Sequence, residues 1–277
     1  MRSSRGVEIK TPEQICAMRR AGLVVERALT AVGEAIGPGV TTAELNDVAA
    51  ETIAAAGALP SFLGYGARPD GTGGFSGVIC ASVNEEIVHG IPSDRTLAEG
   101  DLISVDCGAI LDGWHGDSAR SFAVGEISPE VAELSATTKR ALWAGIAAAR
   151  LDGRVADISA AVEDASGEYG IIEEFVGHGI GSAMHQPPDV HNYRVRGRTP
   201  RIVQGMALAV EPMLTLGAPD NVTLEDEWTV VTLDRSVAAH WEHTITVTEH
   251  GVWVLTALDG GEEILNELGV PFGPLAD

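Results

Sequence analysis

Hydrophobic residues recur at helical spacing in four segments of the chain. The clearest segment begins with a capping box formed by Thr11 and Gln14 and has a proline at its first helical position. Apolar residues then follow every three or four positions until Gly37-Pro38 ends the pattern. The same signals predict further helices from the capping box of Thr41 and Glu44 to Gly57, from Ser128-Pro129 onwards, and over about 157–169.

Apolar, β-prone stretches lie between and after these helices, at 76–83, 101–106, 118–124, 171–176, 206–216, 228–233 and 241–248. The order is two helices followed by strands, repeated once, which indicates two related α+β halves. No linker of Pro, Gly and Ser separates the halves. We therefore expect one domain over residues 1–277, with a short N-terminal segment 1–10 and a peripheral acidic tail over about 259–277.

Five ionisable residues stand in or directly beside these apolar stretches: Asp106, Asp117, His178, Glu211 and Glu242. A single acid of this kind is more often a turn, edge or salt-bridge residue, so only the five residues together indicate a metal site. Carboxylates are rarely buried unless they are paired or bind a metal, and four of them together would repel one another. Two divalent cations would cancel that charge, and oxygen-rich shells suit such ions. The set therefore predicts a metal centre.

Bulk properties exclude several classes of partner. Acidic residues outnumber basic ones by 40 to 18, and the net charge of −22 disfavours direct binding to nucleic acid or to anionic membranes. Three scattered cysteines indicate a reducing compartment rather than a disulfide framework. The start of the chain has no apolar segment typical of a signal peptide, and no apolar run is long enough to span a membrane. We expect a cytoplasmic monomer.

The contexts of these residues resemble the methionine aminopeptidase branch of the pita-bread metallopeptidases, specifically the bacterial type I enzymes. The resemblance runs from about residue 8 to residue 256, and its order and intervals match as well as its motifs. The motifs are ICASVNEEIVHGIP, GDLISVDCGAILDGWHGDSARSF, VGHGIGSAMHQPP, ALAVEPMLTLG, DEWTVVTLDRS and AAHWEHTITVT. The resemblance implies an α+β pita-bread fold, in which helices cover a curved antiparallel sheet with two pseudo-symmetric halves.

The resemblance also implies roles at a centre of two divalent metal ions, which would be Co, Mn, Fe or Zn. Asp106 would bind one ion through both oxygens, while Asp117 and Glu242 would bridge the pair. His178 and Glu211 would complete the shell of the other ion. The metal-activated hydroxide would attack the first peptide bond, and Glu211 would take and relay its proton.

Two histidines and an apolar pocket complete the implied site. His89 would lie near the substrate amine and the leaving nitrogen, and His185 would contact the scissile carbonyl or its oxyanion. The resemblance also implies a substrate pocket lined by Phe62, Tyr65, Cys80, Met184 and Trp228. An apolar residue taken by itself more often belongs to the core. The other histidines stay unassigned, and strand alternation turns His243 away from the face of Glu242.

The chain departs from the family beside this pocket. Type I enzymes usually carry Tyr-His-Gly-Tyr-Pro where this chain has Tyr-Gly-Ala-Arg-Pro at 65–69, followed by the insertion DGTGG at 70–74. Arg68 therefore replaces an aromatic residue of the family, and we expect one aromatic pocket wall to be lost. Met184 stands where the family usually has Phe. These changes affect the shape of the pocket and the substrate range, and they leave the metal ligands intact.

The implied activity is metal-dependent removal of the initiator methionine, so the expected partners are peptides and nascent chains with an N-terminal methionine. An Xaa-Pro peptidase of the same fold is the first alternative. Such enzymes usually carry an extra N-terminal domain, for which the segment before Thr11 is too short. A non-catalytic pita-bread protein that binds partners is the second alternative, and such relatives typically lack ligands that are present here.

Overall fold

The computed structural model describes residues 6–275, so residues 1–5 and 276–277 of the expected terminal segments lie outside it. The four predicted helices are confirmed, with both predicted capping boxes at Thr11 and Thr41. A fifth, short helix in the tail was not predicted. The helices are α1 (Pro12–Ala35), α2 (Thr42–Ala55), α3 (Pro129–Ala148), α4 (Val155–Ser166) and α5 (Glu262–Glu267).

The strands form four small sheets in which every pair of named strands is antiparallel, within residues 6–275. They are ordered β1-β4-β2 with β5 beside β4, β13-β10-β6, β11-β12-β3, and β15-β14-β9-β7-β8. The bounds are β1 (Leu59–Pro60), β2 (Ile79–Val83), β3 (Glu86–Val88), β4 (Leu102–Leu111), β5 (Trp114–Ala123), β6 (Gly170–Ile171), β7 (Gly177–Gly179), β8 (Gln186–Val190), β9 (Ala207–Val210), β10 (Met213–Thr215), β11 (Asn221–Thr223), β12 (Val230–Thr232), β13 (Ala238–His240), β14 (His243–Thr248) and β15 (Gly251–Val254).

Several predicted strands were wrong in extent. Those expected over 101–106 and 118–124 are the longer β4 and β5, and two others are cut short or divided. The strand expected over 171–176 covers only β6, and the following residues form a loop before β7. The strand expected over 206–216 is divided into β9 and β10 at Glu211-Pro212. Proline has no N–H group to donate to a sheet, so the ladder stops there. Glu211 consequently lies at an interruption rather than within a continuous strand.

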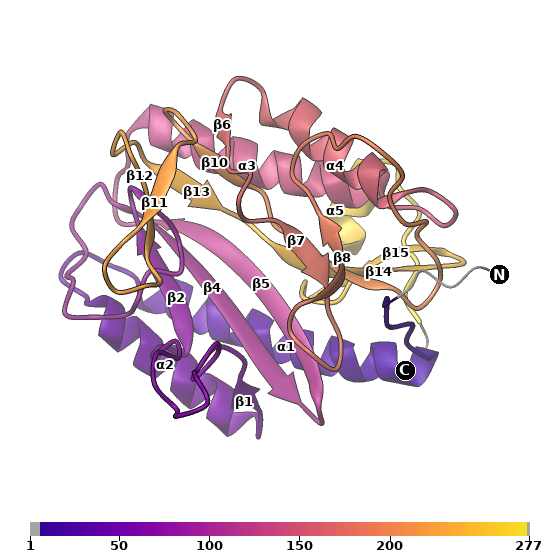
Figure 1. Cartoon of the computed structure of the whole chain (residues 1–277), viewed down its shortest axis with the longest axis horizontal. Helices are drawn as coiled ribbons and strands as arrows, with labels where there is room; N and C mark the ends of the chain where they lie inside the picture. The colour runs from indigo at the N-terminus through magenta and orange to yellow at the C-terminus, as the bar shows by residue number, and fades with distance from the viewer. Residues whose placement is uncertain (1–5, 276–277) are drawn as a thin grey trace.

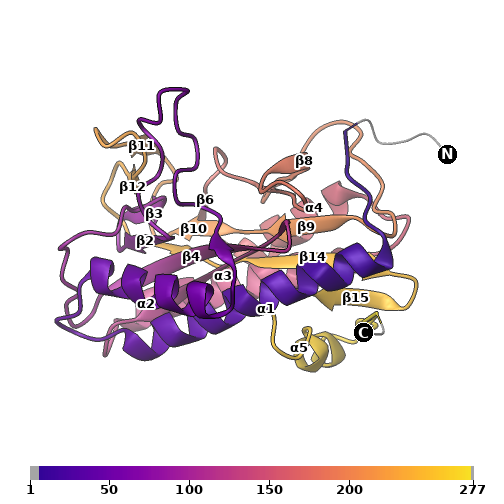
Figure 2. The same ribbon diagram turned by 90° about the horizontal axis from the view of Figure 1, so that it is seen from below.

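The α1 and α2 helices lie along one face of the sheet, with β4 and β5 directly above them (Figure 2). Val105 and Cys107 of β4 point into this layer and are fully buried among apolar side chains of both helices. Asp106 points to the opposite side and lines a cavity, as the alternation of SVDCG predicts. The face away from α1 and α2 is therefore free to carry a functional site.

Helices α3 and α4 cover the second half of the molecule, where Ile146 and Val162 pack with Val210 of β9 and Ile245 of β14. Figure 1 shows the two helix pairs on either side of the central strands. This arrangement agrees with the predicted α+β architecture of helices over antiparallel sheets. Among the helices described, none is both long and apolar enough to cross a membrane.

Candidate metal centre and substrate pocket

Neighbouring strands bring the first two acidic residues together. Asp106 of β4 lies opposite Ala119 of β5, and Asp117 of β5 lies opposite Gly108 of β4. The two acids are thus displaced by two residues along an antiparallel pair and share one face of the sheet. Both side chains line the same cavity.

The other two acids lie where the chain passes from a strand of one sheet to a strand of another. Glu211 lies between β9 and β10, and Glu242 lies between β13 and β14. Because β9 pairs with β14 and β10 pairs with β13, the two interruptions lie next to each other. The backbone N–H of Glu242 donates to the carbonyl oxygen of Ala119 at 2.9 Å, which holds this interruption against β5. Two breaks in paired strands therefore direct both carboxylates toward Asp117.

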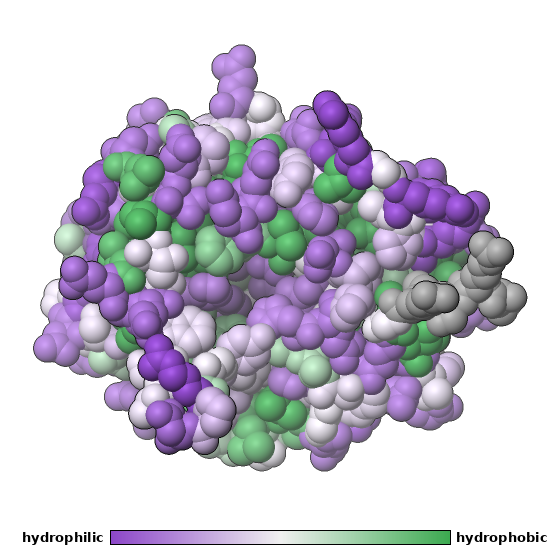
Figure 3. Space-filling model, viewed as in Figure 1, coloured by the Kyte–Doolittle hydropathy of each residue, from purple (hydrophilic) through white to green (hydrophobic). Residues whose placement is uncertain are grey.

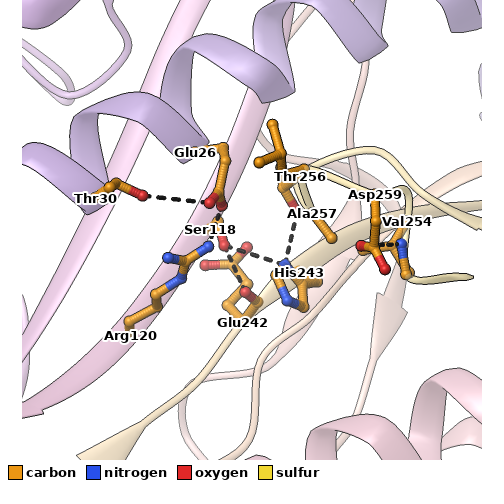
Figure 4. Close-up of polar contacts among 12 residues, drawn as sticks. Glu26, Thr30, Ser118, Arg120, Glu242, His243, Val254, Thr256, Ala257 and Asp259 are labelled. Carbon is orange, nitrogen blue, oxygen red and sulfur yellow. Dashed lines mark hydrogen bonds and ion pairs between the residues drawn. The ribbon is translucent and has the colours of Figure 1, made fainter. Parts of the chain in front are cut away.

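Hydroxyl groups fix the backbone of this region. Ser118 Oγ donates to the carbonyl oxygen of Glu242 at 2.6 Å, and Thr244 Oγ1 donates to the carbonyl oxygen of Asp117 at 2.8 Å. Figure 4 shows Ser118 between Glu242 and His243, whose Nδ1 lies 2.9 Å from Thr256 Oγ1. These bonds satisfy buried polar groups and fix the backbone that carries the side chains of Asp117 and Glu242.

His178 of β7 completes the predicted set of five. Its Nδ1 lies 3.0 Å from the carbonyl oxygen of Gly179, so Nδ1 carries the proton and Nε2 is left as an acceptor. Nε2 lies 3.6 Å from Asp117 Oδ2 and 3.5 Å from Glu211 Oε1. A histidine that donates its other N–H to a backbone carbonyl is typical of metal ligands, because this bond fixes the tautomer and the ring orientation.

The residues form two overlapping groups with the spacing of metal ligands. One contains Asp117, His178 and Glu242, and the other contains Glu211, His240 and Glu242; in each, the ligand atoms lie within 4.8 Å of one another. Glu242 belongs to both groups, which is the arrangement that a bridging carboxylate requires. Asp106 belongs to neither group, although it lines the same cavity.

Charge makes this cluster unfavourable without cations. Burial raises the pKa of all four carboxyl groups well above their ordinary values, and neighbouring carboxylates raise it further for Asp106, Glu211 and Glu242. Three buried carboxylate oxygens have no hydrogen-bond partner, namely Asp106 Oδ1, Asp117 Oδ1 and Glu242 Oε1. Unpartnered oxygens beside an imidazole nitrogen fit divalent cations of the first transition row.

A cavity of about 280 Å³ opens over the five residues, and the predicted substrate residues also line it. Its walls contain Phe62, Tyr65, Cys80, His89, Met184, His185 and Trp228. Figure 3 shows the molecule from the side of Figure 1, where hydrophobic side chains are scattered among polar ones. The sequence therefore selected residues that the fold brings to one place, from segments more than 100 positions apart.

Both predicted histidines lie above the acidic floor. His89 has a φ of +60°, an unusual backbone conformation that is common at functional sites, and burial lowers the pKa of its imidazole to about 4. His185 packs against His178 with ring centroids 4.3 Å apart, and burial lowers its pKa to about 4 as well. Both rings are consequently neutral near pH 7 and able to donate or accept hydrogen bonds.

The expected loss of an aromatic pocket wall was wrong. Arg68 lies outside the cavity, and its Nη2 binds both carboxylate oxygens of Glu227 at 2.9 and 3.2 Å. Phe75, which follows the inserted glycines, enters the cavity wall and contacts Phe62 and Trp228 edge to face. The residue after the insertion thus supplies an aromatic ring while the arginine turns outward, which the residue order alone did not indicate.

The residues of the site that were not predicted include Phe75, Phe175 and His240. Phe175 contacts the ring of His89 edge to face, with centroids 5.4 Å apart. His240 precedes Glu242 by two positions, and ligand atoms of the two residues lie within 4.8 Å of each other. The short spacing in sequence was the available signal. His243 points away toward Thr256 as expected, and His115 contacts Ser61 instead of the acidic cluster.

Comparison with known proteins gives a consistent result. Residues 16–249 match metallopeptidase family M24. The methionine aminopeptidase of Clostridium acetobutylicum is 47% identical over 90% of this chain and 98% of its own length. The crystal structure of methionine aminopeptidase from Thermotoga maritima superposes with a TM-score of 0.85, at 38% identity over 90% of this chain and 99% of that one.

A more distant match shows how widely the architecture is shared. Prolidase from Pyrococcus furiosus superposes with a TM-score of 0.69 at 21% identity, covering 90% of this chain and 65% of that one. At this identity the likeness concerns the fold alone. The extensive matches at high identity, together with the acidic cluster, are decisive: the chain belongs to metallopeptidase family M24 and, within it, to the methionine aminopeptidases.

Proposed function

We propose that the chain removes methionine from the N-terminus of peptides and newly made proteins, using two divalent metal ions. The observation that carries this proposal is the cluster of buried carboxylates and His178 at the floor of an apolar cavity. Asp106, Asp117, His178, Glu211 and Glu242 would hold the ions. When bound, such a pair lowers the pKa of a coordinated water to near neutrality and polarises the scissile carbonyl.

The protein side chains would then orient the substrate and move protons. Glu211, with a carboxyl pKa raised by burial, is the residue best placed to accept a proton and pass it on. His185 would donate a hydrogen bond to the developing oxyanion, a contact typically worth about 2.7–4 kcal/mol. His89, which lines the same cavity beside Phe175, would hold the substrate amine and deliver a proton to the leaving nitrogen.

The cavity walls support a preference for methionine. Phe62, Phe75 and Trp228 form connected edge-to-face contacts, and Cys80 and Met184 belong to the same apolar cluster. An unbranched thioether side chain fills an irregular pocket of this kind and makes favourable contacts with aromatic rings. A branched or charged first residue would lack these contacts.

We further propose that the chain acts as a single-domain monomer in the cytoplasm, on nascent chains. The thiols of Cys80 and Cys107 are free, which suits a reducing compartment. Co, Mn, Fe and Zn are all candidate ions, because a shell of carboxylate and imidazole accepts each of them and availability decides among them.

A peptide panel tests the proposed specificity. The metal-loaded protein is incubated with Met-Gly-Xaa, Leu-Gly-Xaa and Xaa-Pro-Xaa peptides, and the released amino acids are quantified. We expect release of methionine from the first peptide and at least tenfold slower cleavage of the others. Preferential cleavage before proline would instead favour the Xaa-Pro alternative, and no cleavage of any peptide by protein containing two ions would favour a binding protein.

A further inference from the structure

His240 is buried beside the acidic cluster, where its Nε2 faces the carboxylate of Glu211 beyond hydrogen-bond distance. The side chain is 1% exposed, and Nε2 forms no hydrogen bond. Burying an imidazole nitrogen without a partner costs free energy. Packing alone therefore does not explain why a histidine is buried at position 240, beside Glu211 and Glu242.

The backbone holds this histidine firmly. Its N–H lies 3.0 Å from Ser121 Oγ and 3.2 Å from Ser104 Oγ, and its carbonyl oxygen accepts from Ser121 Oγ at 3.0 Å. It also lies opposite Met213 in the pairing of β13 with β10, and Met213 lines the substrate cavity. The backbone of His240 is thus held in position by three neighbouring strands.

The distance from Nε2 to Glu211 is close to that between two ligands of one ion. Nε2 lies 3.7 Å from Glu211 Oε2, which exceeds a hydrogen bond. Two ligand atoms with bonds of about 2.1 Å lie about 3.4–3.6 Å apart at ordinary angles. His178 Nε2 has the same relation to the other oxygen of that carboxylate, at 3.5 Å. The carboxylate of Glu211 therefore lies between two imidazoles.

We propose that His240 is a sixth protein ligand of the metal centre and provides a second imidazole nitrogen to the ion held by Glu211 and Glu242. This inference rests on the proposed metal centre and extends it. A shell with two nitrogens shifts preference toward ions that suit imidazole, such as Fe, Co and Zn, over Mg and Mn. It would also limit rotation of the Glu211 carboxylate, which is the proposed proton acceptor.

Cobalt X-ray absorption spectroscopy tests this assignment, because imidazole rings give a characteristic multiple-scattering signal. The wild type, His178→Ala, His240→Gln and the double variant are loaded with two equivalents of cobalt, and the metal content is measured. We expect two imidazoles per chain in the wild type, one in each single variant and none in the double variant. We also expect His240→Gln to bind cobalt at least about tenfold more weakly. His115→Gln is the matched control and should retain two imidazoles.

The outcome distinguishes failure of this inference from failure of the proposed function. If His178→Ala binds cobalt without any imidazole signal, or if His240→Gln matches the wild type, His240 is not a ligand. His178→Ala retains His240, so it decides the question even if His240→Gln does not fold. Methionine release by the wild type would leave the proposed function standing in either case. A wild type that binds no cobalt and releases no methionine would contradict the proposed function itself.

Discussion

The phenol oxygen of Tyr65 lies 2.6 Å from Nδ1 of His185 at the mouth of the cavity. Burial raises the pKa of Tyr65, so the hydroxyl stays protonated and donates to Nδ1. Nδ1 is then an acceptor, and Nε2 carries the proton that would contact the substrate oxyanion. The pair therefore selects the tautomer that the proposed role of His185 requires.

Tyr65→Phe removes this hydrogen bond and leaves the ring in place. Loss of about 1–1.5 kcal/mol should lower kcat by about tenfold for a Met-Gly-Xaa peptide, with a smaller effect on KM. Steady-state kinetics measures both constants. Tyr193→Phe is the matched control, because Tyr193 lies beside His191 outside the cavity. Equal kinetics for the two variants would show that the bond to His185 has no catalytic consequence.

His89→Asn should lower turnover and spare the metals. Asparagine tolerates the positive φ at this position but cannot transfer a proton, so kcat should fall by about 100-fold or more. Metal content measured by mass spectrometry should match that of the wild type. Loss of bound metal in this variant would overturn the placement of His89 outside the ligand set.

The same variant makes a prediction about stability and pH. Burial lowers the pKa of His89 from its ordinary 6.5 to about 4, so folding favours the neutral ring. Its contribution to stability is fully present above pH 6.5 and is lost as pH falls from 6.5 toward 4. The free energy of unfolding should therefore fall less steeply over this range in His89→Asn than in the wild type, as urea titrations would measure. Parallel curves would contradict the assignment of this pKa.

Asp106→Asn should have opposite effects with and without metal. In the metal-free protein, removing one of four mutually repelling carboxylates should raise the free energy of unfolding by about 1–2 kcal/mol. In the loaded protein it should lower metal occupancy and stability together. Thermal unfolding with and without cobalt measures both effects. Destabilisation of the metal-free protein by a similar amount would mean that Asp106 is mainly a packing residue.

Arg68→Ala tests whether the loop over the cavity affects substrate binding. The ion pair with Glu227 is exposed, so its loss should change stability by less than about 1 kcal/mol. Trp228, the residue after Glu227, lines the cavity. Loss of the ion pair should loosen the loop beside Trp228 and raise KM for methionine peptides by about two- to fivefold. Arg235→Ala removes another exposed pair, with Glu85, and is the control. A KM equal to that of the control would exclude a role for the loop in binding.

The sequence identified the acidic floor because each ligand candidate was unusual in its surroundings. Asp117 and Glu242 lie in apolar stretches, so the free-energy cost of burying their carboxylates could be recognised from the sequence. Capping boxes similarly defined the starts of the first two helices. The position of Glu211 at a strand interruption was less visible, since it depends on how β9 and β10 join different sheets. The local sequence indicates that an acidic residue is unfavourable in an apolar strand, but it does not indicate which sheet that strand joins.

The cavity walls were harder to predict because they depend on loop conformation. Phe75 and Arg68 lie in one loop, yet one ring enters the cavity and the other side chain turns toward Glu227. No periodicity distinguishes these directions in a glycine-rich segment. His240 was overlooked for another reason, since a lone buried histidine is usually unremarkable until its distance to Glu211 is known.

Metal titration of the stripped protein shows whether methionine release depends on two bound ions. Cobalt or manganese is added in steps to metal-free protein, and methionine released from a Met-Gly-Xaa peptide is measured at each step. We predict no release without metal and activity that rises with added metal and reaches a plateau by two equivalents per chain. Methionine release by the metal-free protein at the rate of the loaded protein would contradict the account, as would no release when two ions are bound.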